Sequence, residues 1–153
     1  MYQKVLIPLD GSKEAEGVFG LIQEELDENA QVVLLMVIPP GKTRMAKGEL
    51  LLGIQREEAE GLRALEYVRG VVGLFGGDLG RWDRWCCRVA VARSVSRGIL
   101  DVAGRENVDL VAMYTHDRKG LARLIKGSVA EDVQQGCSVK VRVFTYQELA
   151  AVS

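Results

Sequence analysis

The fold is decided by the stretch Gln31-Val32-Val33-Leu34-Leu35-Met36-Val37-Ile38, which is followed directly by Pro39-Pro40-Gly41. Every residue after Gln31 is apolar, and the run has the length of a strand, far short of a membrane span. A strand that is apolar at nearly every position is covered on both faces. This is typical of a parallel sheet that lies between helices, so we expect an α/β fold.

The segments around this strand alternate between strand length and helical period. Further strands are predicted at 4–9, 83–91, 109–114 and 139–144. Helices are predicted after Ser12, over 49–74, from Ser94 or Ser96, and over 128–135. This order predicts a five-stranded parallel, doubly wound, Rossmann-type sheet with helices on both faces. Residues 1–145 form one domain in this interpretation, and residues 146–153 form a loose tail with room for one helical turn.

Two helices carry apolar residues at helical spacing. In the first helix the stripe consists of Ala15, Val18, Phe19, Ile22 and Leu26. In the long helix over 49–74 we expect the sheet to be faced by Leu51, Ile54, Leu62, Leu65, Val68 and Val72. These stripes would cover the sheet.

Composition narrows the class of protein. The formal net charge of −1 creates no field that would attract nucleic acid or a membrane, so we expect neither as a partner. The N-terminus reaches a polar turn at Asp10, too early for a signal-peptide core. The three cysteines show no CxxC pairing, and Cys86 and Cys87 should point to opposite faces of their strand. We therefore expect a cytoplasmic protein with reduced structural thiols.

Ligands of doubly wound sheets bind beyond the carboxyl ends of the strands, where the strand order reverses. This rule selects three places in the sequence: the loop after Leu9, the turn after Ile38 and the loop after Tyr114. The polar turn Asp10-Gly11-Ser12 follows the first of these strands. We expect a functional site to be built from these segments.

Several motifs, in the correct order, resemble those of the universal stress protein family. Val5-Leu6-Ile7-Pro8-Leu9-Asp10-Gly11-Ser12 resembles its opening strand and turn. The segment 108–113, then Thr115-His116 and Gly127-Ser128-Val129-Ala130-Glu131, resembles its fourth strand, loop and last helix. Val139-Lys140-Val141-Arg142-Val143 resembles its closing strand. The resemblance covers nearly the whole chain and implies an adenine-nucleotide α-hydrolase-like fold of the UspA type.

Nucleotide-binding members of that family carry G-x2-G-x9-G-[ST] after the fourth strand, where glycines allow backbone N–H groups to approach phosphates. The equivalent positions here are Tyr114, Asp117, Gly127 and Ser128, so the spacing is kept and the first two glycines are replaced. Tyr114 adds a large ring and Asp117 a carboxylate, each unfavourable to a triphosphate. Arg118, Lys119, Arg123 and Lys126 could offset the added charge, or could form a solvated basic loop. The family's G-x-P after the third strand is replaced by Arg93-Ser94-Val95.

The resemblance implies a candidate nucleotide site. Its residues would be Pro8, Leu9, Asp10, Val37, Tyr114, His116, Asp117, Arg118, Gly127, Ser128 and Val129. Asp10 would approach the ribose or phosphates, or would equally serve as a turn or cap of the first helix. Ser128 would contact phosphate, or would form a capping box with Glu131. His116, the single histidine, has no nucleophile or metal ligands in a recognisable arrangement with it.

These residues lead to two hypotheses of function. The first is a non-enzymatic stress-response or regulatory protein that lacks family-type ATP binding, with no cofactor, no metal and no catalytic residue. The resemblance implies that it is a homodimer through the last strand, Val139 to Phe144, and its protein partner would be unidentified. The alternative is a nucleotide sensor that binds ATP or AMP with Mg²⁺.

Overall fold

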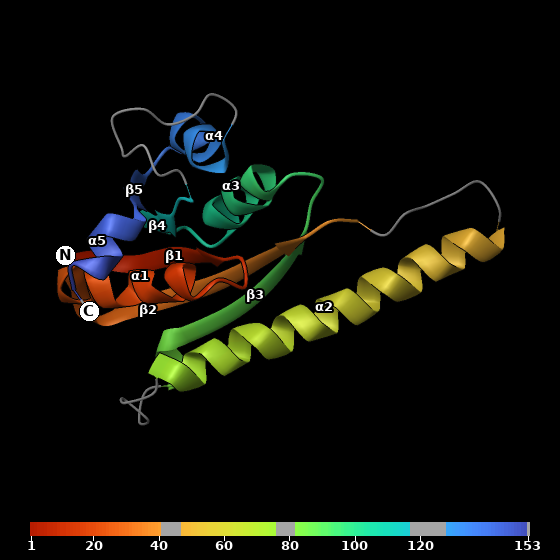
Figure 1. Ribbon diagram of the computed structural model, residues 1–153, viewed down its shortest axis with the longest axis horizontal. Coiled ribbons are helices and arrows are strands. Elements are labelled where there is room, and N and C mark those ends of the chain that lie inside the picture. The colour runs from red at the N-terminus through yellow and green to blue at the C-terminus, as the bar shows by residue number, and fades with distance from the viewer. Residues whose placement is uncertain (41–46, 76–81, 117–127, 153) are drawn as a thin grey trace.

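The computed structural model describes residues 1–40, 47–75, 82–116 and 128–152, and only the backbone of residues 47–57 and 82. Five strands alternate with helices along the chain (Figure 1). The strands are β1 (Tyr2–Leu9), β2 (Leu26–Ile38), β3 (Trp85–Val91), β4 (Leu110–Tyr114) and β5 (Lys140–Phe144). The α-helices are α1 (Lys13–Ile22), α2 (Lys47–Phe75), α3 (Val95–Arg105), α4 (Val129–Gly136) and α5 (Tyr146–Ala150). The described residues also include the short 3₁₀ helices η1 (Gln23–Glu25) and η3 (Trp82–Arg84).

The five strands form one parallel sheet in the order β3-β2-β1-β4-β5. The chain builds the sheet outward from β1 to β3 and then returns to the other side of β1 for β4 and β5. The strand order therefore reverses between β1 and β4, which is the switch point of a doubly wound sheet. The fold predicted from the alternation of segments is confirmed.

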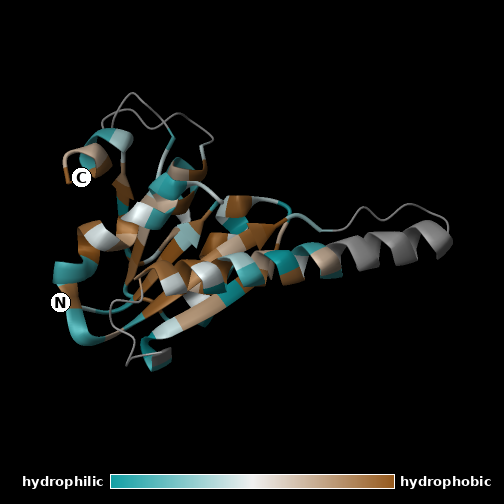
Figure 2. Ribbon diagram, turned by 60° about the horizontal axis from the view of Figure 1, so that its bottom comes forward, coloured by the Kyte–Doolittle hydropathy of each residue, from teal (hydrophilic) through white to brown (hydrophobic). Residues whose placement is uncertain are grey.

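Helices cover both faces of the sheet, and the two faces have separate cores. On one face α1 and α2 pack against alternate residues of β1, including Val5 and Ile7. On the other face α3 and α4 pack against Leu6 and its neighbours on β2, β4 and β5. The apolar strands run between polar-faced helices in Figure 2. Cys87 lies in the first core and Cys86 in the second, as the strand period predicts, and all three cysteines are free thiols.

Strand β2 begins earlier than the sequence indicates. Helix α1 ends at Ile22, and Leu26, predicted as the last residue of its stripe, belongs to β2. Leu26 pairs with Tyr2, and the next pair, Lys4 with Gln31, follows a bulge in which Asn29 N–H donates to Asp27 Oδ1 at 2.9 Å. Leu26 is buried in either arrangement, so its helical spacing from Ile22 was misleading.

Helix α2 covers the sheet with its C-terminal half, and it runs beyond the strands at its N-terminal end (Figure 1). Val68 and Val72 are buried as predicted, whereas Leu62 is 65% exposed. The prediction for Leu62 is wrong because Gly61, one residue earlier, faces Ile38 and turns Leu62 to the side. Leu51 and Ile54 have side chains outside the described residues.

Three predicted serine caps fix the beginnings of the helices. Ser12 accepts a hydrogen bond from Ala15 N–H, Ser94 from Arg97 N–H and Ser128 from Glu131 N–H, each at 3.2 Å. The chain after β5 is not a loose tail. Thr145 and Glu148 form a capping box at α5, and Leu149 lies directly against Gly17 of α1.

Helix α3 approaches the end of β2 closely at Gly98. A Cβ atom at Gly98 would lie 2.7 Å from both methyl groups of Val37, and Val37 is held by a β-branched rotamer that yields poorly. Gly104, on the same helix, has open space at the equivalent atom. Gly98 therefore sets the distance between α3 and the sheet.

We predict that Gly98→Ala lowers the free energy of unfolding by about 1–3 kcal/mol in urea denaturation, because the added methyl overpacks this contact. Gly104→Ala is the matched control and should be neutral or stabilising by up to about 1 kcal/mol. Adding Val37→Ala to Gly98→Ala should recover most of the loss. Equal effects of the two glycine substitutions would contradict this account of α3.

A cluster of ion pairs and hydrogen bonds joins the chain after α3 to β1 and β3. It lies towards the amino ends of the strands, away from Gly98. Glu106, at the end of α3, accepts hydrogen bonds from Lys4 Nζ at 3.1 Å and Arg88 Nε at 2.7 Å. Asp109 accepts from the backbone N–H groups of Gln3 and Lys4 at 2.8 and 2.9 Å. The hydrogen bonds from Arg88 and Lys4 lower the pKa of Glu106, against the opposing effect of burial.

We predict a pH-dependent contribution from this cluster. Because the folded-state pKa of Glu106 lies below its ordinary value of 4.5, its stabilisation is present above that value and is lost as pH falls through the lowered pKa. Glu106→Gln should lower the free energy of unfolding at pH 7 by at most about 1 kcal/mol, as is usual for partly exposed pairs. The difference from wild type should shrink as the pH falls below 4.5 and disappear once Glu106 is protonated in the folded protein. Glu66→Gln, at an exposed site on α2, should show no such pH dependence.

Candidate functional site

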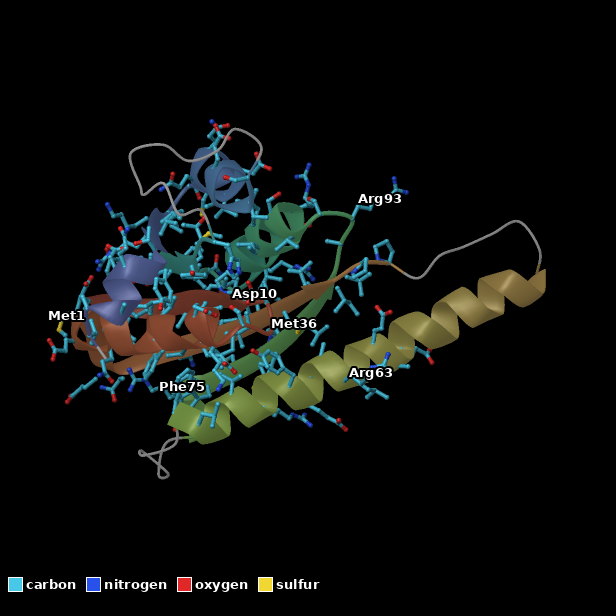
Figure 3. The ribbon with its side chains drawn as sticks, viewed as in Figure 1. Met1, Asp10, Met36, Arg63, Phe75 and Arg93 are labelled. Carbon is cyan, nitrogen blue, oxygen red and sulfur yellow. The ribbon has the colours of Figure 1, made fainter. Side chains whose placement is uncertain are left out.

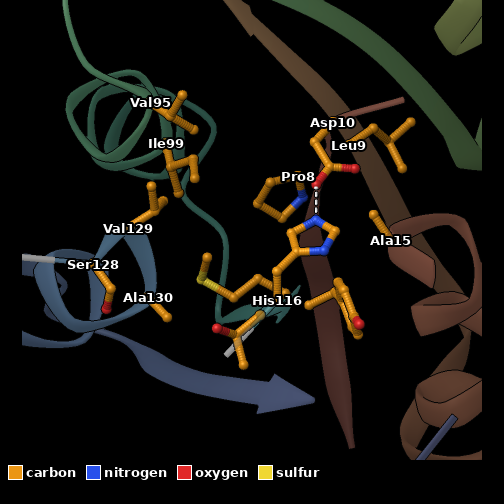
Figure 4. Close-up of a pocket in the computed structure, with 13 residues that line it drawn as sticks. Pro8, Leu9, Asp10, Ala15, Val95, Ile99, His116, Ser128, Val129 and Ala130 are labelled. Atoms are coloured by element: carbon orange, nitrogen blue, oxygen red, sulfur yellow. Dashed lines mark hydrogen bonds and ion pairs between the residues drawn. The ribbon is translucent and has the colours of Figure 1, made fainter. Parts of the chain in front are cut away.

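A cleft of about 450 Å³ opens at the switch point between β1 and β4 (Figure 4). Its floor is made by the ends of these two strands, and its walls by the first turns of α1, α3 and α4. The lining residues are Pro8, Leu9, Asp10, Ala15, Val95, Ile99, Met113, Tyr114, Thr115, His116, Ser128, Val129 and Ala130. The volume lies within the usual range for small-molecule sites.

A second hollow, of about 670 Å³, lies between α2 and β3 and is more open to solvent. Its lining includes Ile38, Leu62, Leu65 and Val91. It lies beside β2 and β3 at the edge of the sheet, away from the point between β1 and β4 where the strand order reverses and ligands of doubly wound sheets bind. The cleft between β1 and β4 is therefore the better candidate site.

Asp10 stands at the carboxyl end of β1, as Figure 3 also shows. Gly11 takes the left-handed conformation, with φ of 87°, and returns the chain so that Ser12 N–H and Oγ donate to Asp10 Oδ1 at 2.9 and 2.5 Å. Burial opposes ionisation of Asp10, but the hydrogen bonds from Ser12 and His116 outweigh it and lower the pKa of the carboxyl group. Asp10 is thus an anion at neutral pH.

His116, which follows β4, contacts Asp10, which follows β1, at one end of the cleft. Its Nε2 lies 2.7 Å from Asp10 Oδ2, marked by the dashed line in Figure 4. Tyr114 meets the His116 ring edge-on, with ring centroids 4.8 Å apart and planes at 89°. Tyr114 itself packs against the core on the α1 and α2 side of the sheet. The Tyr114 ring is therefore part of the wall, and the cleft remains open beside it.

The opposite end of the cleft is apolar. Val95 and Ile99 come from the first two turns of α3, and Val129 and Ala130 from the first turn of α4 (Figure 4). Val95 is 44% exposed and Val129 39% exposed, so both form the rim. An apolar end facing a carboxylate and an imidazole suits a ligand with a flat apolar part and a polar part.

The structure brings most of the predicted site residues together. Seven of them line the cleft: Pro8, Leu9, Asp10, Tyr114, His116, Ser128 and Val129. Val37 does not, because its side chain lies beneath Gly98 of α3. Asp117, Arg118 and Gly127 lie outside the described residues.

The sequence-based selection missed six lining residues, Ala15, Val95, Ile99, Met113, Thr115 and Ala130. Met113 and Thr115 adjoin predicted site residues and follow from the strand-end rule. Val95 and Ile99 are one helical turn apart just after the third strand, a signal that could have found them.

Ser128 Oγ caps α4 by accepting from Glu131 N–H, while the Glu131 carboxylate accepts from Gln135 Nε2 at 3.2 Å.

Within the described ranges, no group of three His, Cys, Asp or Glu side chains could hold a metal ion. Among the helices described, none is both long and apolar enough to cross a bilayer.

Comparison with known proteins gives a consistent result. Residues 1–144 match the model of the universal stress protein family. A universal stress protein of Methanocaldococcus jannaschii is 27% identical over 149 residues, which cover 94% of this chain and 82% of the relative.

Two solved structures share the fold. The universal stress protein UspA from Lactobacillus plantarum superposes with a TM-score of 0.70 at 18% identity, covering 94% of this chain and 97% of that one. A universal stress protein in complex with cAMP superposes with a TM-score of 0.64 at 19% identity and the same coverage. Because the family model spans nearly all of the sequence, the chain belongs to the universal stress protein family.

Proposed function

We propose that this universal stress protein is a non-enzymatic regulatory protein that binds an adenosine monophosphate-type ligand in the cleft between β1 and β4. The observation that carries the proposal is the position of Tyr114. Its ring packs into the α1 and α2 side of the core, and a cavity of about 450 Å³ remains beside it. Replacement of the family glycine by this residue therefore leaves room for a ligand.

The chemistry of the lining supports an adenine nucleoside part. The rim valines, Val95 and Val129, together with Ile99, offer apolar surface to a base. Asp10 is a carboxylate, the group that commonly accepts hydrogen bonds from ribose hydroxyls at such strand ends. Two acceptor positions of Asp10 are used by Ser12 and one by His116, which leaves one of about four for a hydroxyl. The solved relative in complex with cAMP supports the same ligand class.

Charge favours a monophosphate over a triphosphate. Asp10 stays ionised in the cleft, and Asp117 adds a second carboxylate at a position where nucleotide-binding members of the family have glycine. Each unit charge about 4 Å from a phosphate charge costs about 1–4 kcal/mol, depending on exposure. We therefore retain the hypothesis that ATP binding of the family type is lost, and add that a less charged nucleotide binds in its place.

We predict that AMP stabilises the protein. At a hundred times its dissociation constant it should raise the free energy of unfolding by about 2.7 kcal/mol, or the melting temperature by about 5–10 °C. Mg²⁺-ATP should give a smaller shift, and AMP should be recovered unhydrolysed. Differential scanning fluorimetry and chromatography of the ligand measure both.

Val95→Asp places a carboxylate in the cleft and should abolish the shift. Val91→Asp is the matched control, because Val91 is similarly exposed (47% against 44%) and lines the other hollow. No shift of wild type at millimolar AMP would refute the proposed ligand. A loss in both variants would show that the effect does not come from the cleft.

We propose further that the protein is a homodimer through β5. This strand ends the sheet, and within the described chain its outer edge pairs with no other strand. Arg142 does not point outward, because it pairs with Glu25 and lies 4.9 Å over the Phe144 ring. Of the two charged residues of β5, only Lys140 is therefore exposed at the proposed interface.

Size-exclusion chromatography with light scattering should therefore give twice the 16.8 kDa mass of one chain. Val141→Asp, in β5, should give monomer, whereas Val89→Asp, on the half-buried edge strand β3, should leave the dimer intact. Wild type that is monomeric at micromolar concentration would contradict this interface.

A further inference from the structure

The pair formed by His116 and Asp10 has a fixed hydrogen-bond direction. An ionised carboxylate can only accept, so Nε2 of His116 carries a proton and donates to Asp10 Oδ2 across 2.7 Å. Asp10 is in turn held by Ser12, whose N–H and Oγ both donate to Oδ1. The carboxylate is thus fixed on one side by its own turn and on the other by the imidazole.

Two contacts orient the ring of His116 at the end of the cleft. Asp10 fixes one edge of the ring, and Tyr114 meets it at 89° with its own ring anchored in the core. Nδ1 has no hydrogen-bond partner within the described part of the chain. Nε2 already carries a proton. Nδ1 is therefore a hydrogen-bond acceptor in the neutral ring and an N–H donor in the charged ring.

We propose that His116 binds the phosphate of the ligand through Nδ1, with Asp10 and Tyr114 as positioning residues, so that a phosphomonoester binds together with one proton. This inference rests on the proposed function of the cleft and identifies its phosphate-binding group. A phosphate dianion offers only acceptors, so it favours the charged imidazole with its second N–H. A nucleoside without phosphate makes no such demand.

Other ionisable groups near this pair must be considered. Glu16 of α1 and Tyr67 of α2 lie beyond Asp10, with Tyr67 Oη donating to Glu16 at 3.2 Å. Burial and the Glu16 carboxylate raise the pKa of Tyr67 to about 12, so it keeps its proton throughout the range in which imidazole titrates. Tyr114 is the other ionisable side chain in contact with His116. Asp117 and Arg118 follow in sequence, outside the described residues. Within the described part of the chain, His116 is thus the side chain in this group that combines a contact to Asp10 with a second ring nitrogen open to a ligand.

The test is calorimetric titration of the full chain with AMP and with adenosine at pH 7.5, in buffers of different ionisation enthalpy. At this pH the free phosphate is already a dianion, because its second pKa is about 6. The heat of AMP binding should change linearly with the ionisation enthalpy of the buffer, in the direction of proton uptake. The heat of adenosine binding should be independent of the buffer.

His116→Gln supplies the matched variant, because its amide can still donate to Asp10 but cannot take up a proton. It should bind adenosine as wild type does, which shows that the cleft is intact. It should bind AMP about tenfold more weakly at pH 7.5, without proton uptake, a loss equivalent to about 1.4 kcal/mol. Tyr114→Leu, which removes the edge contact, should bind AMP more weakly and leave adenosine unaffected.

Each outcome decides the matter. AMP that binds without proton uptake, or uptake that persists in His116→Gln, overturns the role of His116 and leaves the cleft as the nucleotide site. Failure of both AMP and adenosine to bind overturns the proposed function and this inference together. Uptake in wild type that is absent with adenosine and absent in His116→Gln supports it.

Discussion

The structure depends on the burial of β1 on both faces. This strand is the middle of five, paired to β2 on one side and β4 on the other, and its apolar residues enter both cores. Fully burying side chains of this size contributes about 1.5–3 kcal/mol each, so a position that exposed either face of the strand would cost several kcal/mol. Its carboxyl end must then emerge where the order of strands reverses. The position of Asp10 follows from this constraint.

A cleft arises at that point because the chain leaves β1 and β4, two neighbouring strands, towards opposite faces of the sheet. After β1 the chain turns to α1 on one face, and after β4 it continues towards α4 on the other. The first turns of α1, α3 and α4 surround the gap between them. Gly98 holds α3 near the sheet by its contact with Val37, so the wall that carries Val95 and Ile99 is set by packing. The cleft is thus built from rigid elements, and Asp10 and His116 close one end of it.

Much of this could be predicted from the sequence, because the signals were local. Strand-length apolar runs and the serines at 12, 94 and 128 determined most of the elements and their beginnings. Leu26 was misassigned because a buried residue at helical spacing can equally belong to a strand. Leu62 was misassigned because Gly61, and not Leu62, is the residue of α2 that faces Ile38. Only the tertiary packing shows which side of the helix lies on the sheet. Seven residues of the cleft were found by resemblance and by the strand-end rule. The contact between Val37 and Gly98, and the edge-on contact of Tyr114 with His116, join residues distant in sequence or depend on ring orientation, and no local pattern encodes them.

The position of Tyr114 shows what the replacement of the first family glycine does to the cleft. A tyrosine at this position could have filled the space for a ligand. Its ring instead packs against the core on the α1 side and contacts the ring of His116, which is bonded to Asp10. The most direct measurement of the central claim, that this cleft binds the nucleotide, is methyl NMR of the labelled chain titrated with AMP. Binding in the cleft should give saturable shift changes at Val95, Ile99, Met113 and Val129, with Leu62, Val89 and Val91 of the other hollow unaffected. Changes confined to the second set, or none at millimolar AMP, would contradict it.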